Sequence, residues 1–447
     1  MRIHLSALGC RLNEAELEHW ATQFMTHGHQ IAKRVETADV LVVNTCAVTR
    51  EAMRKSRQRI SRLKRGNPLA KLVVSGCYSQ LESDSALADL GIDLVVNNQN
   101  KDQLVADTLQ AFNLAGMPQG ATLPGESALF ERSRHRAFIK IQDGCRYKCT
   151  FCIVTVARGS ERSREIQSIV DQVCALSDQG IHEIVLTGVH VGGYGTDLGS
   201  NLEMLVRALL QHTDMPRIRF ASVEPWDLSD GFLELFSNPR LLPHMHLPLQ
   251  SGSDSVLKRM ARRCKTADYA RLTQELYDRV PQFNVTTDII VGFPGESEEE
   301  WQQSLAFIRT QKFGHIHVFT YSERSGTHAA KLPDQIPMPV RRERSRKLHE
   351  VADSLKQQKL EKSVGQEVSV LWEQGKPVGD SSSSTVLHEY QGYTPNYQRV
   401  VVQSEAVLSN RVLTTRLIGL TGKQLDGKVL SNNCQNQSIQ NQSIIEC

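Results

Sequence analysis

Three cysteines lie close together at Cys145, Cys149 and Cys152, in the segment Cys-Arg-Tyr-Lys-Cys-Thr-Phe-Cys. Thiolates are the soft ligands that zinc and iron–sulfur clusters require. Structural zinc needs a fourth protein ligand, and the nearby candidates are weak, because Cys174 lies in a predicted helix and His135 precedes a predicted strand. Three thiolates fit instead a four-iron cluster with one iron left open for a substrate or cofactor.

Three further cysteines, Cys10, Cys46 and Cys77, each follow a predicted strand in the first third of the chain. Buried apolar strands that alternate with helices indicate a parallel sheet, in which the carboxyl ends of the strands lie along one edge. Three unrelated buried thiols are the alternative, since free cysteine is often buried, but three equivalent positions favour convergence at one site. The strands are predicted at residues 3–8, 38–43, 71–74 and 93–96, with helices at 13–26 and 50–64.

The elements that position these cysteines predict an α/β multidomain chain. Residues 1–113 form an open parallel α/β sheet, and residues 114–134, with their Gly and Pro, form a linker. Residues 135–362 alternate strands and helices, which predicts a central partial parallel (β/α) barrel. Residues 363–431 predict a small β-barrel, and residues 432–447 a disordered tail. The strands of the central barrel are predicted at 138–141, 183–186, 218–221, 244–247, 284–290 and 315–320, followed by a closing helix at 340–362.

Composition excludes several classes of protein. The 447 residues include 52 Lys and Arg against 49 Asp and Glu, a net charge of +3, so any contact with nucleic acid must come from local patches. No run of about 18 apolar residues occurs, so neither a transmembrane helix nor a membrane partner is predicted. The start of the chain lacks a signal-like segment, which favours a cytoplasmic location. Ten cysteines are too few for a disulfide scaffold of this size.

The spacing Cys-x3-Cys-x2-Cys, with Phe151 before the last cysteine and a predicted strand before the loop, resembles the signature of radical S-adenosylmethionine (SAM) enzymes. The resemblance implies that Cys145, Cys149 and Cys152 bind a [4Fe–4S] cluster whose open iron chelates SAM. In that family an electron from the reduced cluster cleaves SAM to methionine and a 5′-deoxyadenosyl radical, so a reducing electron donor is implied as well.

The resemblance then extends over nearly the whole chain to the methylthiotransferases. These enzymes join a three-cysteine amino-terminal domain and a radical SAM domain to a small RNA-binding barrel, the TRAM domain, which residues 365–368 and 392–397 resemble. The resemblance implies that Cys10, Cys46 and Cys77 hold an auxiliary [4Fe–4S] cluster. The implied cofactors are therefore two [4Fe–4S] clusters and SAM.

The resemblance also indicates where SAM would bind. The segments 186–189, 248–253 and 288–295 each lie at the end of a predicted strand and are similar to the parts of the family that contact SAM. Considered alone, such segments are only strand-end turns, in which Gly and Ser are common. The implied cofactor-binding residues are Tyr147, Phe151, Thr187, Gly188, Gln250, Ser251 and Gly292.

Family members differ in substrate. Residues 8–13, 141–145 and 186–195 are most similar to the group that adds a 2-methylthio group at C2 of N6-threonylcarbamoyladenosine-37 of tRNA. The alternatives are isopentenyladenosine-37 of tRNA and an aspartate of a ribosomal protein. The chain departs from the family at Thr155, where proline is usual. The hydrogen at an aromatic carbon has no useful acidity, which explains why radical chemistry would replace a general base.

Basic and aromatic residues are candidates for contacts with tRNA. Eight Lys or Arg and one Glu lie between Arg50 and Arg65, which predicts a cationic helix face that can hold phosphates. An ordinary solvated helix face is the alternative. Tyrosines of the small β-barrel could stack on bases or belong to its core. The candidate RNA-binding residues are Arg54, Arg57, Arg158, Arg162, Tyr393 and Tyr397.

A function of another class is a non-enzymatic RNA-binding protein that holds a cluster or zinc. It predicts no cleavage of SAM and a purely structural role for Cys145. The two readings differ in metal content, because two four-iron clusters require about eight iron atoms per chain. For the enzyme we expect a monomer that acts on tRNA.

Overall fold

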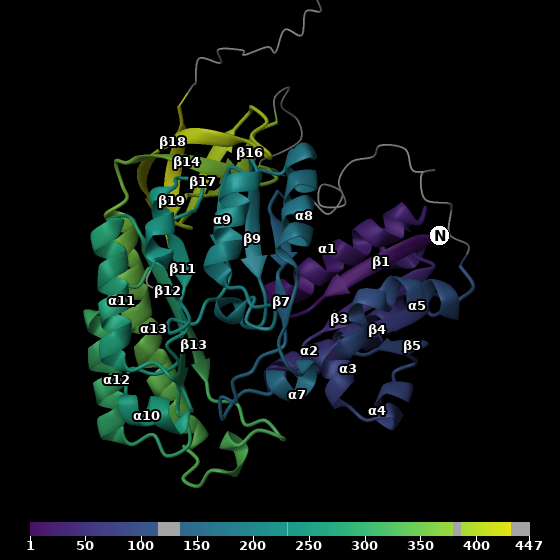
Figure 1. Cartoon of the computed structure of the whole chain (residues 1–447), viewed down its shortest axis with the longest axis horizontal. Coiled ribbons are helices and arrows are strands. Elements are labelled where there is room, and N and C mark those ends of the chain that lie inside the picture. Colours follow the sequence, from purple (N-terminus) through teal and green to yellow (C-terminus); the bar gives the residue numbers. More distant parts are fainter. Residues whose placement is uncertain (115–134, 230, 379–385, 431–447) are drawn as a thin grey trace, which may run out of the picture.

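The computed structural model describes residues 1–114, 135–229, 231–378 and 386–430. Figure 1 shows a central barrel with an amino-terminal α/β domain beside it and a small β-domain at one end. All of the predicted linker except residue 114, and the predicted tail 432–447, lie outside the described residues. None of the described helices combines the length and the apolar character that a membrane crossing requires.

The amino-terminal domain is an open parallel sheet with strand order β2-β1-β3-β4-β5. Its neighbouring strands are all parallel, which confirms the predicted α/β class. Each face of the sheet is covered: β1 and α1 share a cluster around Trp20 and Val42, and α2 packs Ile60 and Leu63 on the other face. The elements are β1 Arg2–Ala7, α1 Arg11–Thr26, β2 Gln30–Ile31, η1 Val35–Thr37, β3 Val40–Thr45, α2 Arg50–Gly66, β4 Lys71–Gly76, α3 Cys77–Leu81, α4 Asp84–Ala88, β5 Leu94–Val96, η2 Asn98–Gln103 and α5 Leu104–Ala111.

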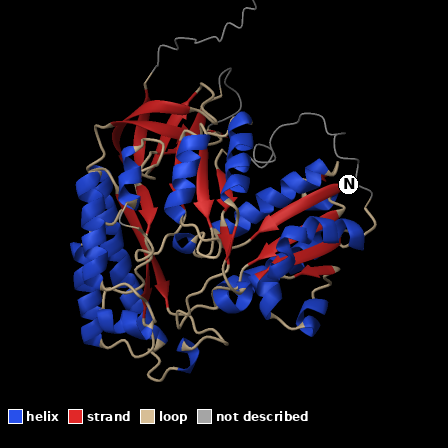
Figure 2. Ribbon diagram, viewed as in Figure 1, coloured by secondary structure: helices blue, strands red, loops and turns tan. Residues whose placement is uncertain are grey.

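The central domain is a partial barrel made of two three-stranded parallel sheets, β10-β9-β6 and β11-β12-β13. Single parallel bridges, Ile218 to Leu241 and Ser222 to His246, join the two sheets. Helices cover the outside of the barrel (Figure 2). The strands are β6 Ala137–Lys140, β7 Gln142–Asp143, β8 Arg162–Ser163, β9 Glu183–Thr187, β10 Arg217–Phe220, β11 His244–His246, β12 Asn284–Val291 and β13 His315–Thr320. The helices are α7 Val154–Arg158, α8 Ile166–Asp178, η3 Val191–Gly193, α9 Leu202–His212, η4 Phe232–Ser237, α10 Asp254–Arg259, α11 Thr266–Arg279, α12 Glu298–Thr310, η5 Ala329–Lys331 and α13 Met338–Glu361.

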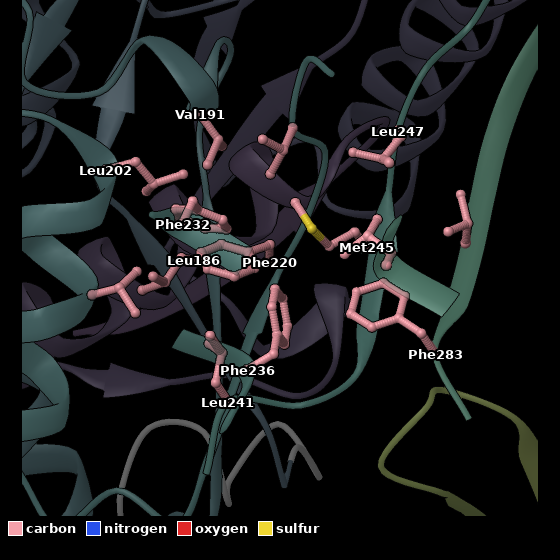
Figure 3. Packing of buried hydrophobic residues seen from close by; sticks show 14 of the residues in the cluster. Leu186, Val191, Leu202, Phe220, Phe232, Phe236, Leu241, Met245, Leu247 and Phe283 are labelled. Carbon is pink, nitrogen blue, oxygen red and sulfur yellow. The ribbon is translucent and has the colours of Figure 1, made fainter. Parts of the chain in front are cut away.

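Strand alternation divides the barrel residues into two sets. Apolar side chains such as Leu186, Phe220 and Met245 join the large core beneath the helices (Figure 3). The residues between them in the sequence, including Arg219 and His246, face the barrel interior and line a cavity. Because side chains alternate across a strand, the same strands build a hydrophobic shell and a polar interior.

The carboxy-terminal domain is a closed barrel in which β14 pairs with both β18 and β16; its strand pairs are antiparallel except for the parallel pair β17 and β19. Its core contains Trp372, Tyr390 and Leu425, so Tyr390 is a core residue. The barrel covers the amino-terminal ends of the central strands, where Arg217 donates to the carbonyl of Tyr393 at 3.1 Å. The elements are β14 Glu367–Trp372, β15 Lys376–Pro377, β16 His388–Tyr393, β17 Arg399–Ser404, β18 Val412–Thr421 and β19 Gln424–Val429.

A buried carboxylate, Glu183, organises this junction. Its oxygens accept from Arg217 at 2.8 Å and from Arg219 at 3.2 Å, and Arg136 lies 3.9 Å away. Burial alone would raise its pKa, but the charges of Arg219, Arg217 and Arg136 lower the pKa of Glu183 to about 2. The arginines in turn donate to carbonyls of the carboxy-terminal barrel, which connects the two domains.

We expect Glu183 to make folding stability depend on pH. Its folded pKa of about 2 lies below the ordinary value of 4.5, so its contribution is complete above pH 4.5 and is lost as the pH falls toward 2. The contribution is about 3 kcal/mol. Urea unfolding of cluster-free protein should show a steeper loss of stability between pH 5 and pH 3 for the wild type than for Glu183→Gln. Equal slopes would contradict this prediction.

We expect Phe220 to be a main contributor to the barrel core. Its ring is 1% exposed and lies 5.5 Å from that of Phe232. Phe220→Ala should lower the free energy of unfolding by about 3–5 kcal/mol, because truncation leaves a cavity. Phe319→Ala is the matched control, since Phe319 is 44% exposed. Urea unfolding followed by tryptophan fluorescence would measure both changes, and a similar loss in the two variants would contradict the assignment.

Candidate active site

The loop after β7 carries Cys145, Cys149 and Cys152 and runs into α7. Gly144 turns the chain into this loop with φ +71°, and a Cβ atom there would lie 1.9 Å from the carbonyl oxygen of Ser160. Only glycine therefore permits this turn. The amide of Cys145 donates to Gly159, and that of Cys152 to Cys149, which folds the loop back on itself.

These three thiols are suited to binding a metal cluster. Burial raises the pKa of Cys145 to about 12 and that of Cys152 to about 11, and neighbouring thiolates of the set raise them further. Thiolates in this setting need a nearby positive charge, which iron supplies. All eight cysteines that the structure describes are free thiols, so no disulfide competes. The donor set fits the predicted three-thiolate iron–sulfur site.

Thr155, where the family usually has proline, closes the same loop. Its hydroxyl donates to the carbonyl of Tyr147 at 3.0 Å, from the first turn of α7. Proline has no such donor. In this chain a side-chain hydrogen bond therefore holds the segment between Cys145 and Cys149.

Cys10, Cys46 and Cys77 come together at the carboxyl edge of the amino-terminal sheet. They follow β1, β3 and β4, which are adjacent in the sheet. A Cβ atom at Gly9 would lie 2.6 Å from the sulfur of Cys46. Burial, with Cys10 and Cys77 nearby, raises the pKa of Cys46 to about 11. The three thiols thus lie near one another at this edge, and three thiolates are a donor set that would fit a cluster; their role as cluster ligands stays a prediction.

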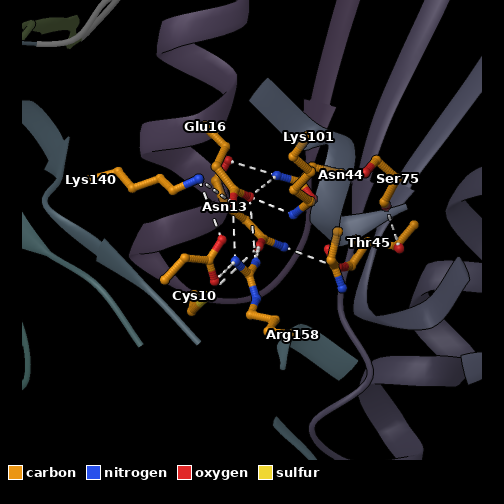
Figure 4. Close-up of polar contacts among 12 residues, drawn as sticks. Cys10, Asn13, Glu16, Asn44, Thr45, Ser75, Lys101, Lys140 and Arg158 are labelled. Atoms are coloured by element: carbon orange, nitrogen blue, oxygen red, sulfur yellow. Dashed lines mark hydrogen bonds and ion pairs between the residues drawn. The ribbon is translucent and has the colours of Figure 1, made fainter. Parts of the chain in front are cut away.

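Arg158 bonds residues near both cysteine sites, and Figure 4 shows it beside Asn13 and Glu16, close to Cys10. Its guanidinium donates to Glu16 at 3.0 Å, to Asp143 at 2.9 Å and to Asn13 at 2.8 Å. The prediction that Arg158 contacts RNA is wrong, because the residue is 2% exposed and saturated by buried partners. Sequence alone could not reveal this, since Glu16 lies far away along the chain.

The position of Arg158 in the chain shows which segments this contact joins. Arg158 ends α7, which follows Cys152, whereas Asn13 and Glu16 lie in the first turns of α1, which follows Cys10. Lys101 completes the network by donating to Glu16 at 2.6 Å. One buried set of charges therefore fixes the loop of each cysteine site relative to the other.

We expect Arg158→Met to destabilise the chain by about 3–5 kcal/mol, because it leaves Glu16 and Asp143 buried without their main partner. Arg162→Met is the matched control, since the Arg162 side chain is 45% exposed and should change stability by about 0.5 kcal/mol or less. Urea unfolding would measure both variants. Similar stabilities for the two variants would show that the network does not hold the domains together.

The predicted SAM-binding residues lie near the cysteine loop at the carboxyl ends of the central strands. Thr187 ends β9, Gly188 follows it, and both line the cavity. Gln250 has φ +78° and exchanges backbone hydrogen bonds with β12, next to Ser251. Gly292 has φ +70°, and a Cβ atom there would lie 2.5 Å from Arg341. These positions match the expected edge of the barrel.

The two aromatic candidates of the cysteine loop have different surroundings. The Tyr147 hydroxyl donates to Asp227 at 2.8 Å, and its ring lies 4.7 Å from His190. Phe151 packs against a small core cluster that contains Phe293. Tyr147 is therefore held by polar partners, whereas Phe151 anchors the loop through apolar contact.

Sequence reasoning missed His190, which lies next to this loop. Its ring nitrogens contact Glu161 at 2.5 Å and Asp227 at 2.6 Å, and its side chain is 1% exposed. Burial opposes the charged form, but Asp227, Glu224 and Glu161 raise the pKa of His190. The Gly-rich segment around His190 was the available signal, and its carboxylate partners lie in other loops.

A cavity of about 830 Å³ occupies the barrel interior. Gly9, Cys10 and Arg11 of the amino-terminal domain line it, and so do Thr187 and Gly188 of the central barrel. This volume lies in the range of ligand-binding cavities, about 300–1,000 Å³. One of the amino-terminal cysteines and one of the predicted SAM-binding segments therefore face a common space.

The remaining RNA-binding candidates lie in three places, and the first of them, Arg162, is exposed on β8. Arg54 and Arg57 are exposed on α2, where Arg54 pairs with Glu51 at 2.6 Å. Tyr393 and Tyr397 line the cavity and stack on each other with ring centroids 4.8 Å apart. Contacts of these residues with RNA stay a prediction.

Comparison with known proteins agrees with this geometry. Residues 139–308 match the model of the radical SAM superfamily, and residues 2–97 match that of the uncharacterized protein family UPF0004. A radical SAM methyltransferase, TsrM from Kitasatospora setae, shares the fold with a TM-score of 0.53 at 15% identity, over 71% of this chain and 72% of that one. The barrel and its cysteine loop thus define a radical SAM enzyme.

Curated relatives narrow the class. The threonylcarbamoyladenosine tRNA methylthiotransferase MtaB of Bacillus subtilis is 36% identical over 88% of each chain. The protein of the same name from Thermotoga maritima is 34% identical over 83% of this chain and 86% of its own. A tRNA-2-methylthio-N(6)-dimethylallyladenosine synthase of Staphylococcus aureus is 34% identical over 83% of this chain and 74% of its own. This chain therefore belongs to the family of radical SAM tRNA methylthiotransferases.

Proposed function

We propose that this chain adds a methylthio group to C2 of N6-threonylcarbamoyladenosine at position 37 of tRNA. The observation that carries the proposal is the cavity, which reaches from Cys10 at one cysteine site to Thr187 and Gly188 beside the other. A base in this space would lie between a source of sulfur and a source of radicals. The MtaB proteins, named for this substrate, are similar to this chain over most of its length.

We assign the metal ligands by the two thiol sets. Cys145, Cys149 and Cys152 would hold one [4Fe–4S] cluster, and Cys10, Cys46 and Cys77 the auxiliary one. When bound, the clusters and SAM would supply the radical chemistry and the sulfur needed to exchange the hydrogen at C2 for a methylthio group. Tyr147, Phe151, Thr187, Gly188, Gln250, Ser251 and Gly292 would orient SAM.

The protein itself would bind the substrate base, orient it and shield it from solvent. The barrel walls and the carboxy-terminal barrel enclose the cavity, which limits the access of water and of other quenchers to the reacting base. Adenosine-37 lies in a single-stranded loop, where a base can be splayed out of the stack into a protein site. Arg158 and its partners would keep the two reactive loops at a fixed separation across that base.

The choice of base follows from the polarity of the cavity. Its lining includes Arg11, His246 and His317, which favour a polar, anionic substituent over the apolar isopentenyl group. A tRNA substrate further implies a cytoplasmic location, and single-electron chemistry implies a reducing partner. We infer a monomer, because one chain supplies both cysteine sites and the cavity between them.

We expect Cys149→Ala and Cys10→Ala to abolish product formation while each retains one cluster. Anaerobically reconstituted wild-type protein should hold about eight iron atoms, and each variant about four. The measurements are iron and sulfide analysis, together with mass spectrometry of nucleosides from tRNA incubated with SAM and dithionite.

Three outcomes would revise the proposal. Zinc in place of iron would support the non-enzymatic alternative. A 2-methylthio derivative of isopentenyladenosine as the main product would keep the chemistry and change the substrate. Full activity in Cys10→Ala would remove the role of the amino-terminal site. Cys174→Ala is the matched control, because Cys174 lies on α8 away from both sets.

A further inference from the structure

The charges that line the barrel cavity are strongly unbalanced. Six of the lining residues are Lys or Arg, whereas Asp288 is the one carboxylate among them. Most of these cations already have partners: Arg219 bonds Glu183, Lys359 donates to the carbonyl of Phe283, and Lys423 pairs with Asp353. A cavity with this balance is suited to an anion.

Arg11 and Lys356 are the lining cations for which the described residues provide no hydrogen bond or ion pair, and of these two Arg11 lies next to Cys10. It begins α1, directly after Cys10, and it is exposed to the cavity. Within the part of the chain that the structure describes, it forms no ion pair and no hydrogen bond, and its guanidinium lies over the ring of Phe138 at 5.1 Å. The guanidinium is therefore positioned by an aromatic ring while its five donors remain available.

His317 faces the same space from β13. Its ring lies 4.5 Å from that of His315 and 5.5 Å from that of His246. His246 is fixed by Asp288 at 3.2 Å and by Thr286 at 3.0 Å, whereas no hydrogen bond of His317 occurs among the described residues. Burial, His246 and Arg11 lower the pKa of His317, which keeps a neutral ring with one N–H to donate.

We propose that Arg11 and His317 form the subsite that binds the carboxylate on the N6 substituent of the substrate base. This inference rests on the proposed function and adds the residues that select its substrate. A carboxylate matches the guanidinium fork, and a neutral imidazole N–H can donate to the same group. Isopentenyladenosine has no group that could use these donors, so it would leave them desolvated and unpaired.

A divalent cation is the competing occupant, because ligand atoms of His246, Asp288 and His317 lie within 4.8 Å of one another. Two features oppose it. Asp288 already pairs with His246, and the facing charge of Arg11 repels a cation. The carboxylate is therefore the favoured ligand, and metal binding becomes an outcome of the test.

The test measures binding of two RNAs to the reconstituted full-length protein by fluorescence anisotropy. Both RNAs are anticodon stem-loops with N6-threonylcarbamoyladenosine at position 37, and in the second the carboxylate is converted to a primary amide. The wild type should bind the carboxylate form about tenfold more tightly, which corresponds to about 1.4 kcal/mol. Arg11→Gln and His317→Phe should lose most of this preference, and Arg11→Lys should retain part of it.

Controls separate this subsite from other effects. Lys423→Gln removes a charge at the cavity rim and should weaken binding of both RNAs equally, because it would act on phosphates. Unchanged iron content and absorbance of Arg11→Gln would show that the neighbouring Cys10 site is intact. An unchanged preference in Arg11→Gln would overturn the inference while leaving the proposed function in place.

Two further outcomes would lead to different conclusions. If the wild type methylthiolates neither RNA and binds both equally, the proposed function itself fails. If calorimetry with Mn²⁺ shows one tight site that is lost in His246→Ala and in His317→Phe, the cluster is a metal site and the carboxylate inference is wrong.

Discussion

The burial of the Arg158 guanidinium between two domains is the constraint on which the site depends. A buried charge is tolerated only when partners surround it, and here Glu16, Asp143 and Asn13 come from opposite sides of a domain junction. Separating the domains would break the bonds of Arg158 to Glu16 and Asn13 and leave the guanidinium with Asp143 alone. Asn13 and Glu16 follow Cys10 closely in the chain, and Arg158 follows Cys152. The electrostatic requirement therefore also sets the distance between the two cysteine sites.

In the central barrel, too, a neighbouring domain provides partners for buried polar groups. Its interior is polar because alternate strand residues turn away from the helices. These polar groups need either water or protein partners. At the amino-terminal ends of the strands, Arg217 donates to Glu183, and Arg217 and Arg219 donate to carbonyls of the carboxy-terminal barrel. Between the strands a cavity remains, and residues of both the carboxy-terminal barrel and the amino-terminal domain contribute to its lining. The small barrel thus closes one end of the site in addition to any role with RNA.

The sequence predicted the parts of this structure that depend on local pattern. Buried strands, helices between them and the position of Cys10, Cys46 and Cys77 at strand ends follow from periodicity and from the parallel arrangement, and the three thiols do converge. Arg158 and His190 were not predictable in this way. Their partners lie in distant segments, and a charged residue in a loop has the same local pattern whether it meets solvent or a buried carboxylate.

A reaction that joins two cysteine sites at one base requires both rigidity and access. The buried charges provide rigidity, since no rotation between the domains can keep Arg158 paired with both Glu16 and Asp143. Access comes from the incomplete barrel, whose two edge strands, β6 and β13, place Phe138 and Phe319 in the cavity wall. The amino-terminal domain, through Gly9 to Leu12, forms another part of that wall. The base would therefore enter where the barrel is open and meet the auxiliary site there, which explains why Cys10 is exposed while Cys46 and Cys77 are buried.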